Sequence, residues 1–261
     1  MGDGQARIIA VANEKGGVGK TAMVVNLGAA LSLENKRVLV VDMDPQHNAT
    51  IGLGVKVADN MPSVYDLITD DDPPEVRQVV LSTLWENLDL IPSHIDLAGA
   101  ELELADLPGR ETKLAEALSD LTGEYDFILI DTPPSLSLLT VNVFACATEV
   151  LVPCHTHPYA LKALDDLFDT IDNVREGINQ AIRITGIVPT FFDKRTSLSQ
   201  RMVDRLRQDE RYAGYLFDSM IRTNTAVALS SDVGKPVVFF KKSSYGAWDY
   251  SRLAEELLVK E

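Results

Sequence analysis

The chain has 261 residues, of which 46% are hydrophobic and 24% charged, and its formal net charge at pH 7 is −15. The length and apolar content support one large domain, or at most two small ones, and the acidic balance excludes nucleic-acid binding over the whole surface. Two cysteines are too few for a disulfide framework, and we find no apolar run of about 20 residues and no signal-peptide pattern. We therefore expect a reduced, cytoplasmic protein without a membrane span.

Short apolar runs, typical of buried strands, recur from one end of the chain to the other. Between them lie longer stretches with helical periodicity. The predicted strands are residues 8–12, 38–42, 88–91, 127–131, 150–153, 184–189 and a short 215–217. The predicted helices are residues 20–33, 63–68, 74–84, 97–104, 111–121, 138–147, 161–178, 198–208, 225–231 and 245–259.

Continuous apolar strands that alternate with helices are typical of a parallel sheet covered on both faces. We find no internal repeat and no linker that would split the chain. The expected fold is therefore a single α/β domain over residues 1–261, with a doubly wound, mostly parallel sheet and helices on both faces.

A glycine-rich loop, KGGVGKT at residues 15–21, joins the first predicted strand to the first predicted helix. Glycines let the backbone approach an anion closely, and the loop N–H groups and the helix N-terminus then face phosphates. Lys20 can reach the terminal phosphates, and the Thr21 hydroxyl can be a ligand of Mg²⁺. The expected nucleotide-binding residues are Lys15, Gly16, Gly17, Val18, Gly19, Lys20, Thr21 and Ala22.

The loop departs from the usual phosphate-loop pattern at two neighbouring positions. Glu14 stands where that pattern has its first glycine, and Lys15 adds a second lysine. One lysine is enough to serve a nucleotide in its own subunit, so the second lysine is the informative departure. A solvated loop lysine is the alternative interpretation.

Acidic residues follow two predicted strands at the edge where ligands bind in open α/β sheets. Asp42 and Asp44 follow one strand, and Asp131 ends another. Each alone reads as a turn or cap residue, but together with the glycine loop they suggest a magnesium and hydrolysis site. Asp131 suits an indirect metal role, Asp44 is placed to orient an attacking water, and Asp42 is the alternative for that task.

Three segments make the sequence recognisable: residues 13–21 (NEKGGVGKT), 41–46 (VDMDPQ) and 130–135 (IDTPPS). They resemble the ParA/Soj family of partition ATPases, in the deviant phosphate-loop (Walker A) class of P-loop NTPases. The likeness continues at residues 97–101, 193–196, 234–236 and 244–247, so it runs nearly end to end.

The resemblance implies a Mg²⁺-dependent ATPase that forms a homodimer with two ATP or ADP molecules between its subunits. By this resemblance Lys15 reaches the partner's nucleotide, while Lys20 holds phosphates in its own subunit. Thr21 resembles the magnesium ligand and Asp44 the water-positioning residue. Asp131 resembles the carboxylate that acts on the metal indirectly, and Asp42 is a further candidate residue of the metal site.

The basic charge is concentrated late in the chain. Residues 194–242 carry 10 Lys and Arg against 5 Asp and Glu, whereas residues 1–193 carry 12 against 30. ParA-like dimers bind DNA without sequence preference through late basic residues, and an apolar stripe of Leu198, Met202 and Leu206 would turn the neighbouring arginines outward. The candidate DNA-binding residues are Arg195, Arg201, Arg205, Arg222 and Lys235.

A solvated basic face that balances an acidic body is the alternative to DNA binding. The sequence also departs from the family near Arg222, where one expected arginine is displaced and another is absent. This departure bears on the details and strength of any DNA contact.

The resemblance also implies a partner, a ParB-like or other cargo-adaptor protein with a basic segment, and a nucleoid-associated location. The cargo is a chromosome or plasmid, or else a protein assembly such as a chemosensory array or a microcompartment. A MinD-like membrane switch is disfavoured, because residues 253–261 are acidic and short. An iron–sulfur enzyme is disfavoured because Cys146 and Cys154 do not closely follow the motifs at Asp44 and Asp131.

Overall fold

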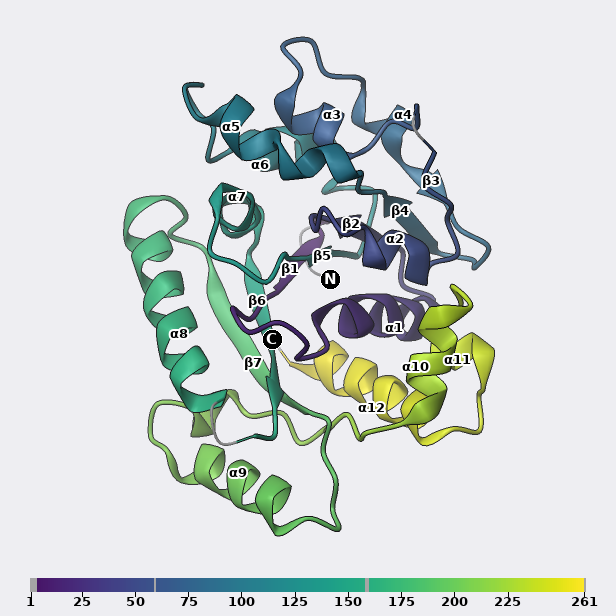
Figure 1. The fold of residues 1–261 in the computed structure, drawn as a ribbon, viewed down its shortest axis with the longest axis vertical. Coiled ribbons are helices and arrows are strands. Elements are labelled where there is room, and N and C mark those ends of the chain that lie inside the picture. The colour runs from purple at the N-terminus through teal and green to yellow at the C-terminus, as the bar shows by residue number, and fades with distance from the viewer. Residues whose placement is uncertain (1–3, 59, 158–159, 261) are drawn as a thin grey trace.

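A seven-stranded sheet forms the centre of the computed structural model, which describes residues 4–58, 60–157 and 160–260 (Figure 1). The strand order is β3-β4-β2-β5-β1-β6-β7, and all neighbours pair in parallel except β3 and β4. The strands are β1 (Arg7–Val11), β2 (Val38–Asp42), β3 (Leu81–Ser82), β4 (Leu88–Ile91), β5 (Phe127–Asp131), β6 (Glu149–His155) and β7 (Arg183–Thr190). The mostly parallel sheet of the sequence prediction is confirmed.

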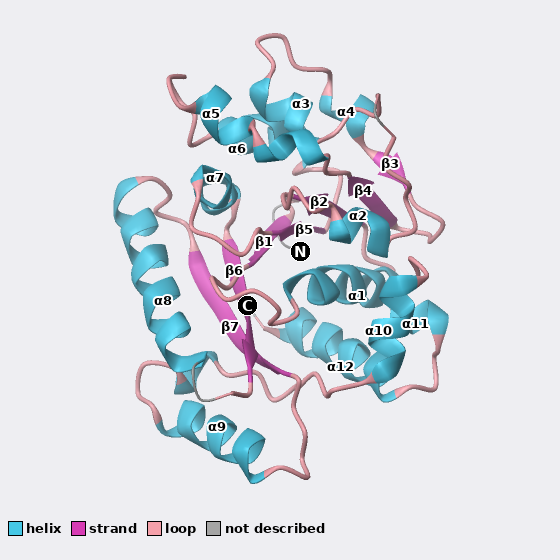
Figure 2. Cartoon of the chain, viewed as in Figure 1, coloured by secondary structure: helices cyan, strands magenta, loops and turns pink. Residues whose placement is uncertain are grey.

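Helices cover both faces of this sheet (Figure 2). The α-helices are α1 (Lys20–Leu33), α2 (Asn48–Gly52), α3 (Val64–Thr69), α4 (Val76–Val79), α5 (Ala100–Leu104), α6 (Lys113–Leu118), α7 (Leu138–Cys146), α8 (Ala160–Gly177), α9 (Ser197–Gln208), α10 (Thr225–Asp232), α11 (Val237–Phe240) and α12 (Tyr245–Val259). Short 3-10 turns are η1 (Ile95–Ala98), η2 (Ser119–Leu121) and η3 (Ala213–Tyr215). None of the helices in the described part of the chain is long and apolar enough to cross a membrane.

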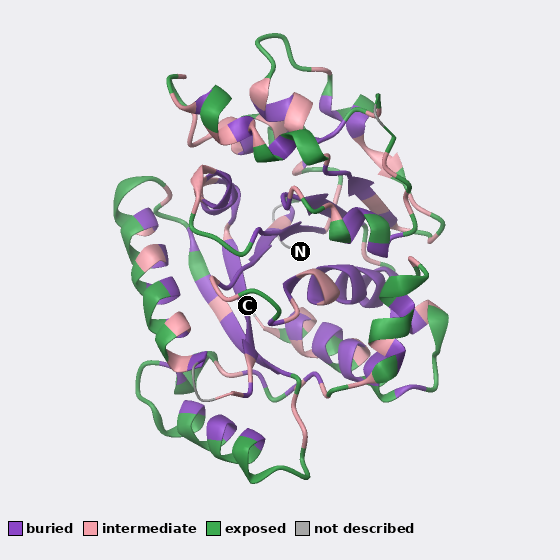
Figure 3. Ribbon diagram, viewed as in Figure 1, coloured by how far each residue is buried: buried purple, intermediate pink, exposed green. Residues whose placement is uncertain are grey.

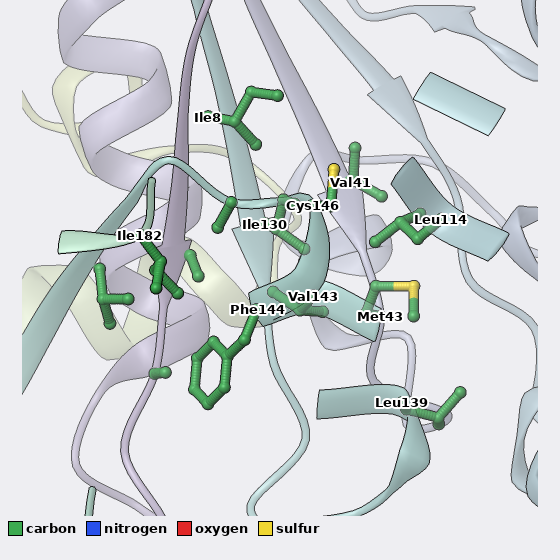
Figure 4. Close-up of a cluster of buried hydrophobic side chains, with 14 of the residues drawn as sticks. Ile8, Val41, Met43, Leu114, Ile130, Leu139, Val143, Phe144, Cys146 and Ile182 are labelled. Carbon is green, nitrogen blue, oxygen red and sulfur yellow. The ribbon is translucent and has the colours of Figure 1, made fainter. Parts of the chain in front are cut away.

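The two helical layers exist because successive residues of a strand point to opposite faces. In β5, Ile128 and Ile130 belong to the core under α7 and α8, whereas Leu129 belongs to the core under α1 and α12. Figure 4 shows the first of these cores, where Ile130 lies among side chains that include Val143 and Phe144 of α7. Helix α1 is buried along almost its whole length (Figure 3), which anchors the glycine loop that precedes it.

Tertiary pairing overrode the local sequence signal at several places. The predicted helix 74–84 is wrong in its second half, because Leu81–Ser82 pairs antiparallel with β4 as an edge strand. The predicted strand 215–217 does not form: Tyr215 ends the 3-10 turn η3, and Leu216 makes one isolated bridge to Ile187. The predicted helix 97–104 is broken at Gly99, and the short helices α2 and α11 were not predicted. The predicted acidic end of the chain includes Glu261, which lies outside the described residues.

The central strands bring the acidic residues of the sequence analysis to one edge. Strand β5 lies between β2 and β1, and its last residue, Asp131, is in register with Asp42 of β2 and with Val11 of β1. The glycine loop leaves the carboxyl end of β1 at this same edge. The topology therefore places the loop beside both strand-end carboxylates.

A buried ion pair lies at the opposite end of the sheet. Glu149 begins β6 and accepts two hydrogen bonds from the Arg7 guanidinium, each of 2.7 Å. Burial alone would raise the pKa of Glu149, but hydrogen bonds from Arg7 and Thr185, with the charges of Arg7 and Arg183, outweigh it and hold the pKa below its usual value. The ionised carboxylate therefore stabilises the fold.

We expect Glu149→Gln to lower the free energy of unfolding at pH 7 by somewhat less than the roughly 3 to 5 kcal/mol typical of a broken, fully buried pair, since the Arg7 side chain is 25% exposed. The folded pKa lies below the unfolded one. The stabilisation is thus present above the unfolded pKa of about 4.3 and is lost as the pH falls through the folded pKa. Urea unfolding at pH 7 and pH 4 measures both effects.

Glu124→Gln is the matched control, because Glu124 pairs with Arg77 on the surface. Exposed pairs contribute about 1 kcal/mol or less. Equal losses in the two variants would contradict the role given to Glu149.

Candidate functional site

The glycine loop curls around a cavity of about 390 Å³ at the carboxyl edge of the sheet. Gly17 and Gly19 have φ values of 73° and 94°, a left-handed conformation that favours glycine. Helix α1 begins at Lys20 without a side-chain cap, so its first N–H groups remain available to a ligand. This geometry is typical of an anion-binding helix N-terminus. The cavity lining includes Gly16, Gly17, Gly19, Lys20, Thr21, Ala22, Asp44, Gln46, Asn48, Pro134 and Phe191.

Lys20 lies inside this site rather than in solvent. The residue is 7% exposed, and its Nζ donates a hydrogen bond to the Asn13 carbonyl oxygen at 3.1 Å. Burial lowers the pKa of Lys20, while the charges of Asp131 and Asp44 act in the opposite direction. The lysine is thus held by its own chain at the wall of the cavity.

Lys15 lies differently, although it belongs to the same loop. Its backbone N–H donates to Asn13 Oδ1 at 2.9 Å, which turns the loop at this point. Lys15 is half-buried, and it is not among the residues that line the cavity. Burial lowers the pKa of His155, at the end of β6, and the positive charge of Lys15 lowers it further. Lys20 therefore belongs to the cavity wall, whereas the charge of Lys15 acts near the end of β6.

The two neighbouring aspartates also have different surroundings. The Asp42 carboxylate is fully buried and accepts hydrogen bonds from Thr50 N, Thr50 Oγ1 and Asp44 N, at 2.8, 2.7 and 3.2 Å. Asp44 lines the cavity, and of its two carboxylate oxygens only Oδ1 has a hydrogen-bond partner in the described residues, the Gln46 N–H at 2.9 Å. Asp42 braces the loop that follows β2, and Asp44 is the aspartate that faces the cavity.

Asp131 is a buried carboxylate whose charge its own chain offsets only in part, through the Thr21 hydroxyl and the charge of Lys20. It is 0% exposed, and neither carboxylate oxygen has a hydrogen-bond partner among the described residues. Burial, followed by the negative charge of Asp42, raises its pKa well above the usual value. An orphaned acid behind the Thr21 hydroxyl fits a divalent cation, whose charge or bound waters would satisfy it.

A second cavity of about 370 Å³ adjoins the first and shares Gly19, Ala22 and Phe191 with it. Sequence reasoning did not identify this cavity, because its walls combine the start of α1 with the end of β7, the segment 221–224, α10 and α12, which are far apart along the chain. Phe191 between the two cavities has φ 51°, which is strained for an aromatic residue. The surface that the cavity exposes is mostly carbon, although several of the remaining lining residues are polar. The remaining lining consists of Thr190, Ile221, Arg222, Thr223, Asn224, Thr225, Val227, Ala228, Ser231 and Tyr250.

The late basic residues do not share one environment. Arg201 and Arg205 are exposed on α9, and Lys235 is exposed after α10. Arg195 is exposed and pairs with Asp193 at 2.8 Å. Arg222 is half-buried and bound to the buried Asp249.

The predicted apolar stripe on α9 is only partly correct. Met202 and Leu206 are buried, as predicted, but Leu198 is 40% exposed, and Ser199 and Val203 complete the buried face. The helix is turned about its axis from the orientation that the stripe implied.

Comparisons with known proteins agree with this geometry. Residues 6–184 match a protein family described as an AAA domain. The chain is 41% identical to the sporulation initiation inhibitor protein Soj of Bacillus subtilis over 251 residues, which cover 96% of this chain and 98% of that protein. It is 38% identical to the chromosome partitioning protein ParA of Myxococcus xanthus, over 98% of this chain and 89% of that protein.

A solved structure from Mycobacterium smegmatis has a similar fold. This protein, described as cobyrinic acid a,c-diamide synthase with bound ATP analog and magnesium, is 34% identical, with a TM-score of 0.85. The similarity covers 97% of this chain and 94% of the other.

We expect Asp131→Asn to stabilise the ligand-free protein at pH 8 by about 1 to 3 kcal/mol, because it removes a carboxyl group whose ionisation is opposed by burial and by the charge of Asp42. Asp42→Asn should destabilise it, since an amide keeps only one acceptor oxygen and its NH2 group cannot accept, so the hydrogen bonds from Thr50 and from Asp44 N cannot all be kept. Thermal unfolding without nucleotide or metal compares the two variants. A loss of stability in Asp131→Asn would mean that the carboxylate is compensated.

Proposed function

Because this chain belongs to the ParA/Soj family of P-loop ATPases, we propose that it is an ATP-driven switch that positions DNA or another cargo. In this proposal ATP binding brings two copies together, the dimer binds DNA without sequence preference, and hydrolysis releases it. Three observations support the proposal: the glycine-loop cavity, the orphaned Asp131 and the second lysine outside the cavity.

The two adjoining cavities suit the two ends of a nucleotide. We infer that the phosphates of ATP or ADP lie at the glycine loop, against Lys20 and the N-terminus of α1, and that the base enters the apolar cavity beside Phe191. Thr21, with Asp131 behind it, would hold Mg²⁺, which neutralises phosphate charge. The metal-side role predicted for Asp42 is not supported by its position, because its oxygens are engaged by Thr50 and Asp44.

Asp44 is our candidate for the residue that positions the attacking water. Its Oδ1 is held by the Gln46 N–H, and the Ser93 hydroxyl donates to its backbone oxygen at 2.8 Å. These contacts fix the side chain at the cavity wall and leave Oδ2 available to orient a water. Hydrolysis would then give ADP and phosphate.

The position of Lys15 is the observation that supports ATP-dependent dimerisation. A lysine in a phosphate-binding loop that does not line the loop's own cavity is available to a second copy. Two triphosphates that face each other across an interface repel strongly. A lysine supplied by each subunit to the other's nucleotide would offset this repulsion, so association would depend on ATP.

Exposed basic residues on α9 and after α10 are the proposed DNA contacts, chiefly Arg201, Arg205 and Lys235, with Arg195 nearby in sequence. The proposed partner is a ParB-like or other cargo-adaptor protein with a basic segment. The excess negative charge of residues 1–193 would attract that segment. The cargo would be a chromosome or plasmid, and the location the nucleoid.

We expect Lys15→Gln to retain ATP binding but to lose ATP-induced dimers, because the cation offered to the partner's nucleotide is gone. Light scattering with and without ATP measures the dimer, and a fluorescent ATP analogue measures binding. Unaltered dimerisation of this variant would rule out the role in the partner's site.

Asp44→Ala is the matched control from the same site. It should bind ATP and dimerise, yet release phosphate at least about 100-fold more slowly, as for the loss of a general base or water-positioning group. Normal phosphate release in this variant would move the role to another residue.

We expect Arg201→Gln/Arg205→Gln to weaken ATP-dependent DNA binding and to reduce the slope of log affinity against log salt by about 2, because each lost phosphate contact removes about 0.9. Fluorescence anisotropy with a labelled duplex, at two salt concentrations and with ATP, ADP or no nucleotide, measures this. Arg175→Gln on α8 is a control outside the basic segment. DNA binding that responds to neither salt nor nucleotide would refute the proposal.

A further inference from the structure

Two large aromatic side chains are exposed on one face of α12, next to the candidate DNA-binding segment. Tyr245 is 67% and Trp248 52% exposed, and Arg252 follows one turn later. The spacings of three and four residues place all three side chains on the same face of the helix. Exposed aromatic rings that lie together indicate a binding surface more often than isolated ones do.

Arg222 holds these rings in place. Its guanidinium carbon lies 4.2 Å from the centroid of the Tyr245 ring and 5.0 Å from that of the Trp248 ring. The guanidinium of Arg252 lies 5.1 Å from the Trp248 ring centroid. The four side chains form an alternating array of cations and rings, which we call the aromatic–arginine ladder.

Arg222 already forms an ion pair within the protein. Its Nε lies 3.0 Å from Oδ1 of Asp249, its Nη2 bonds the same oxygen, and its backbone N–H donates to Oδ2 at 3.0 Å. Asp249 is 2% exposed. Moving the guanidinium to an external phosphate would leave a buried carboxylate unpaired, which is strongly unfavourable. Arg222 is therefore suited to position its neighbours and unsuited to contact DNA.

The ladder is continuous with the loop that carries Arg195. Phe192 and Arg222 form a parallel bridge, with Phe192 N–H donating to the Ile221 oxygen at 3.0 Å and Thr223 N–H to the Phe192 oxygen at 3.3 Å. On the other side, α12 is preceded by the exposed Lys241 and Lys242. The rings therefore lie next to residues 194–242, the part of the chain that carries the excess of positive charge.

We propose that Tyr245, Trp248 and Arg252 contact the sugar–phosphate backbone of DNA, and that Arg222 is a positioning residue for them. The indole N–H and the phenol O–H donate to phosphate oxygens, the ring edges pack against deoxyribose, and Arg252 supplies the charge. This inference rests on the proposed function, since it names further contacts for the same DNA-bound state.

Anionic DNA fits the ladder better than a lipid surface does. Aromatic rings that anchor a protein in a membrane enter the boundary between headgroups and acyl chains. Here guanidinium groups lie over the ring of Trp248, so insertion of that ring would take two arginines out of water. A hydrated phosphate backbone lets the cations stay solvated and paired.

Anisotropy titrations of a labelled duplex in ATP, at several salt concentrations, test the contacts. Trp248→Ala and Tyr245→Ala should each lower affinity about 5-fold with an unchanged salt slope, because each removes one uncharged hydrogen-bond donor. Arg252→Gln should reduce the slope by about 0.9. Leu84→Ala, at a residue 88% exposed, is the control and should change nothing.

The double variant Arg222→Met/Asp249→Leu tests the positioning role. It removes both charges together, so no buried carboxylate is left unpaired. The affinity for DNA should fall by as much as in Trp248→Ala, and the slope of log affinity against log salt should stay unchanged. A slope reduced by about 0.9 would make Arg222 a phosphate contact and overturn its assignment.

Fluorescence gives a readout independent of affinity. In a Trp85→Phe background Trp248 is the remaining tryptophan, and its emission should change on DNA addition with the same midpoint as the anisotropy. Wild-type affinity in Trp248→Ala and Tyr245→Ala, or a blue shift and co-sedimentation with phosphatidylglycerol vesicles, would overturn the inference. Failure of the unsubstituted protein to bind DNA in ATP would instead refute the proposed function.

Discussion

A single electrostatic constraint organises this molecule: buried charges of both signs must coexist at the carboxyl edge of the sheet. Lys20 and Asp131 are both buried there, and Asp44 lies at the same cavity wall. Burial lowers the pKa of the lysine and raises that of Asp131. Neither charge is fully satisfied by the chain itself, so the site is stabilised by a ligand that brings both phosphates and a divalent cation.

The rest of the fold holds this edge rigid. Helix α1 is anchored by apolar contacts along almost its whole length, and Asp42 ties the loop after β2 to Thr50 through two hydrogen bonds. Among the non-glycine residues with a left-handed φ, Phe191 is the one that lines the two cavities. A stiff scaffold with local strain at the ligand is the usual arrangement of a site whose occupant changes an equilibrium.

The surface that we assign to DNA is physically connected to the nucleotide site. Arg222 lines the apolar cavity together with Gly19 and Ala22, and the same side chain stacks against Tyr245 and Trp248 on the outside. A ligand in this cavity and a duplex on the surface would therefore both act on the segment around Arg222. Such a shared element is the physical basis that coupling between two sites requires.

Much of the fold and the nucleotide site was predictable from local pattern. The long strands, the helix 20–33 and the glycine loop are determined by residues close together in sequence, and the alternation of buried side chains along β5 follows from strand geometry. The edge strand β3 was not predictable, because Leu81–Ser82 is extended only through its pairing with β4.

By itself, the sequence determined the phosphate-binding loop, the order of the long strands and helices, and the presence of a second lysine, since each depends on chemistry within a few residues. Only the tertiary structure decided which aspartate faces the cavity, that Lys15 does not line it, and that Arg222 is bound to Asp249 across 27 residues. The reason is that burial and pairing of a charge depend on groups brought together from distant parts of the chain, and no local pattern records them.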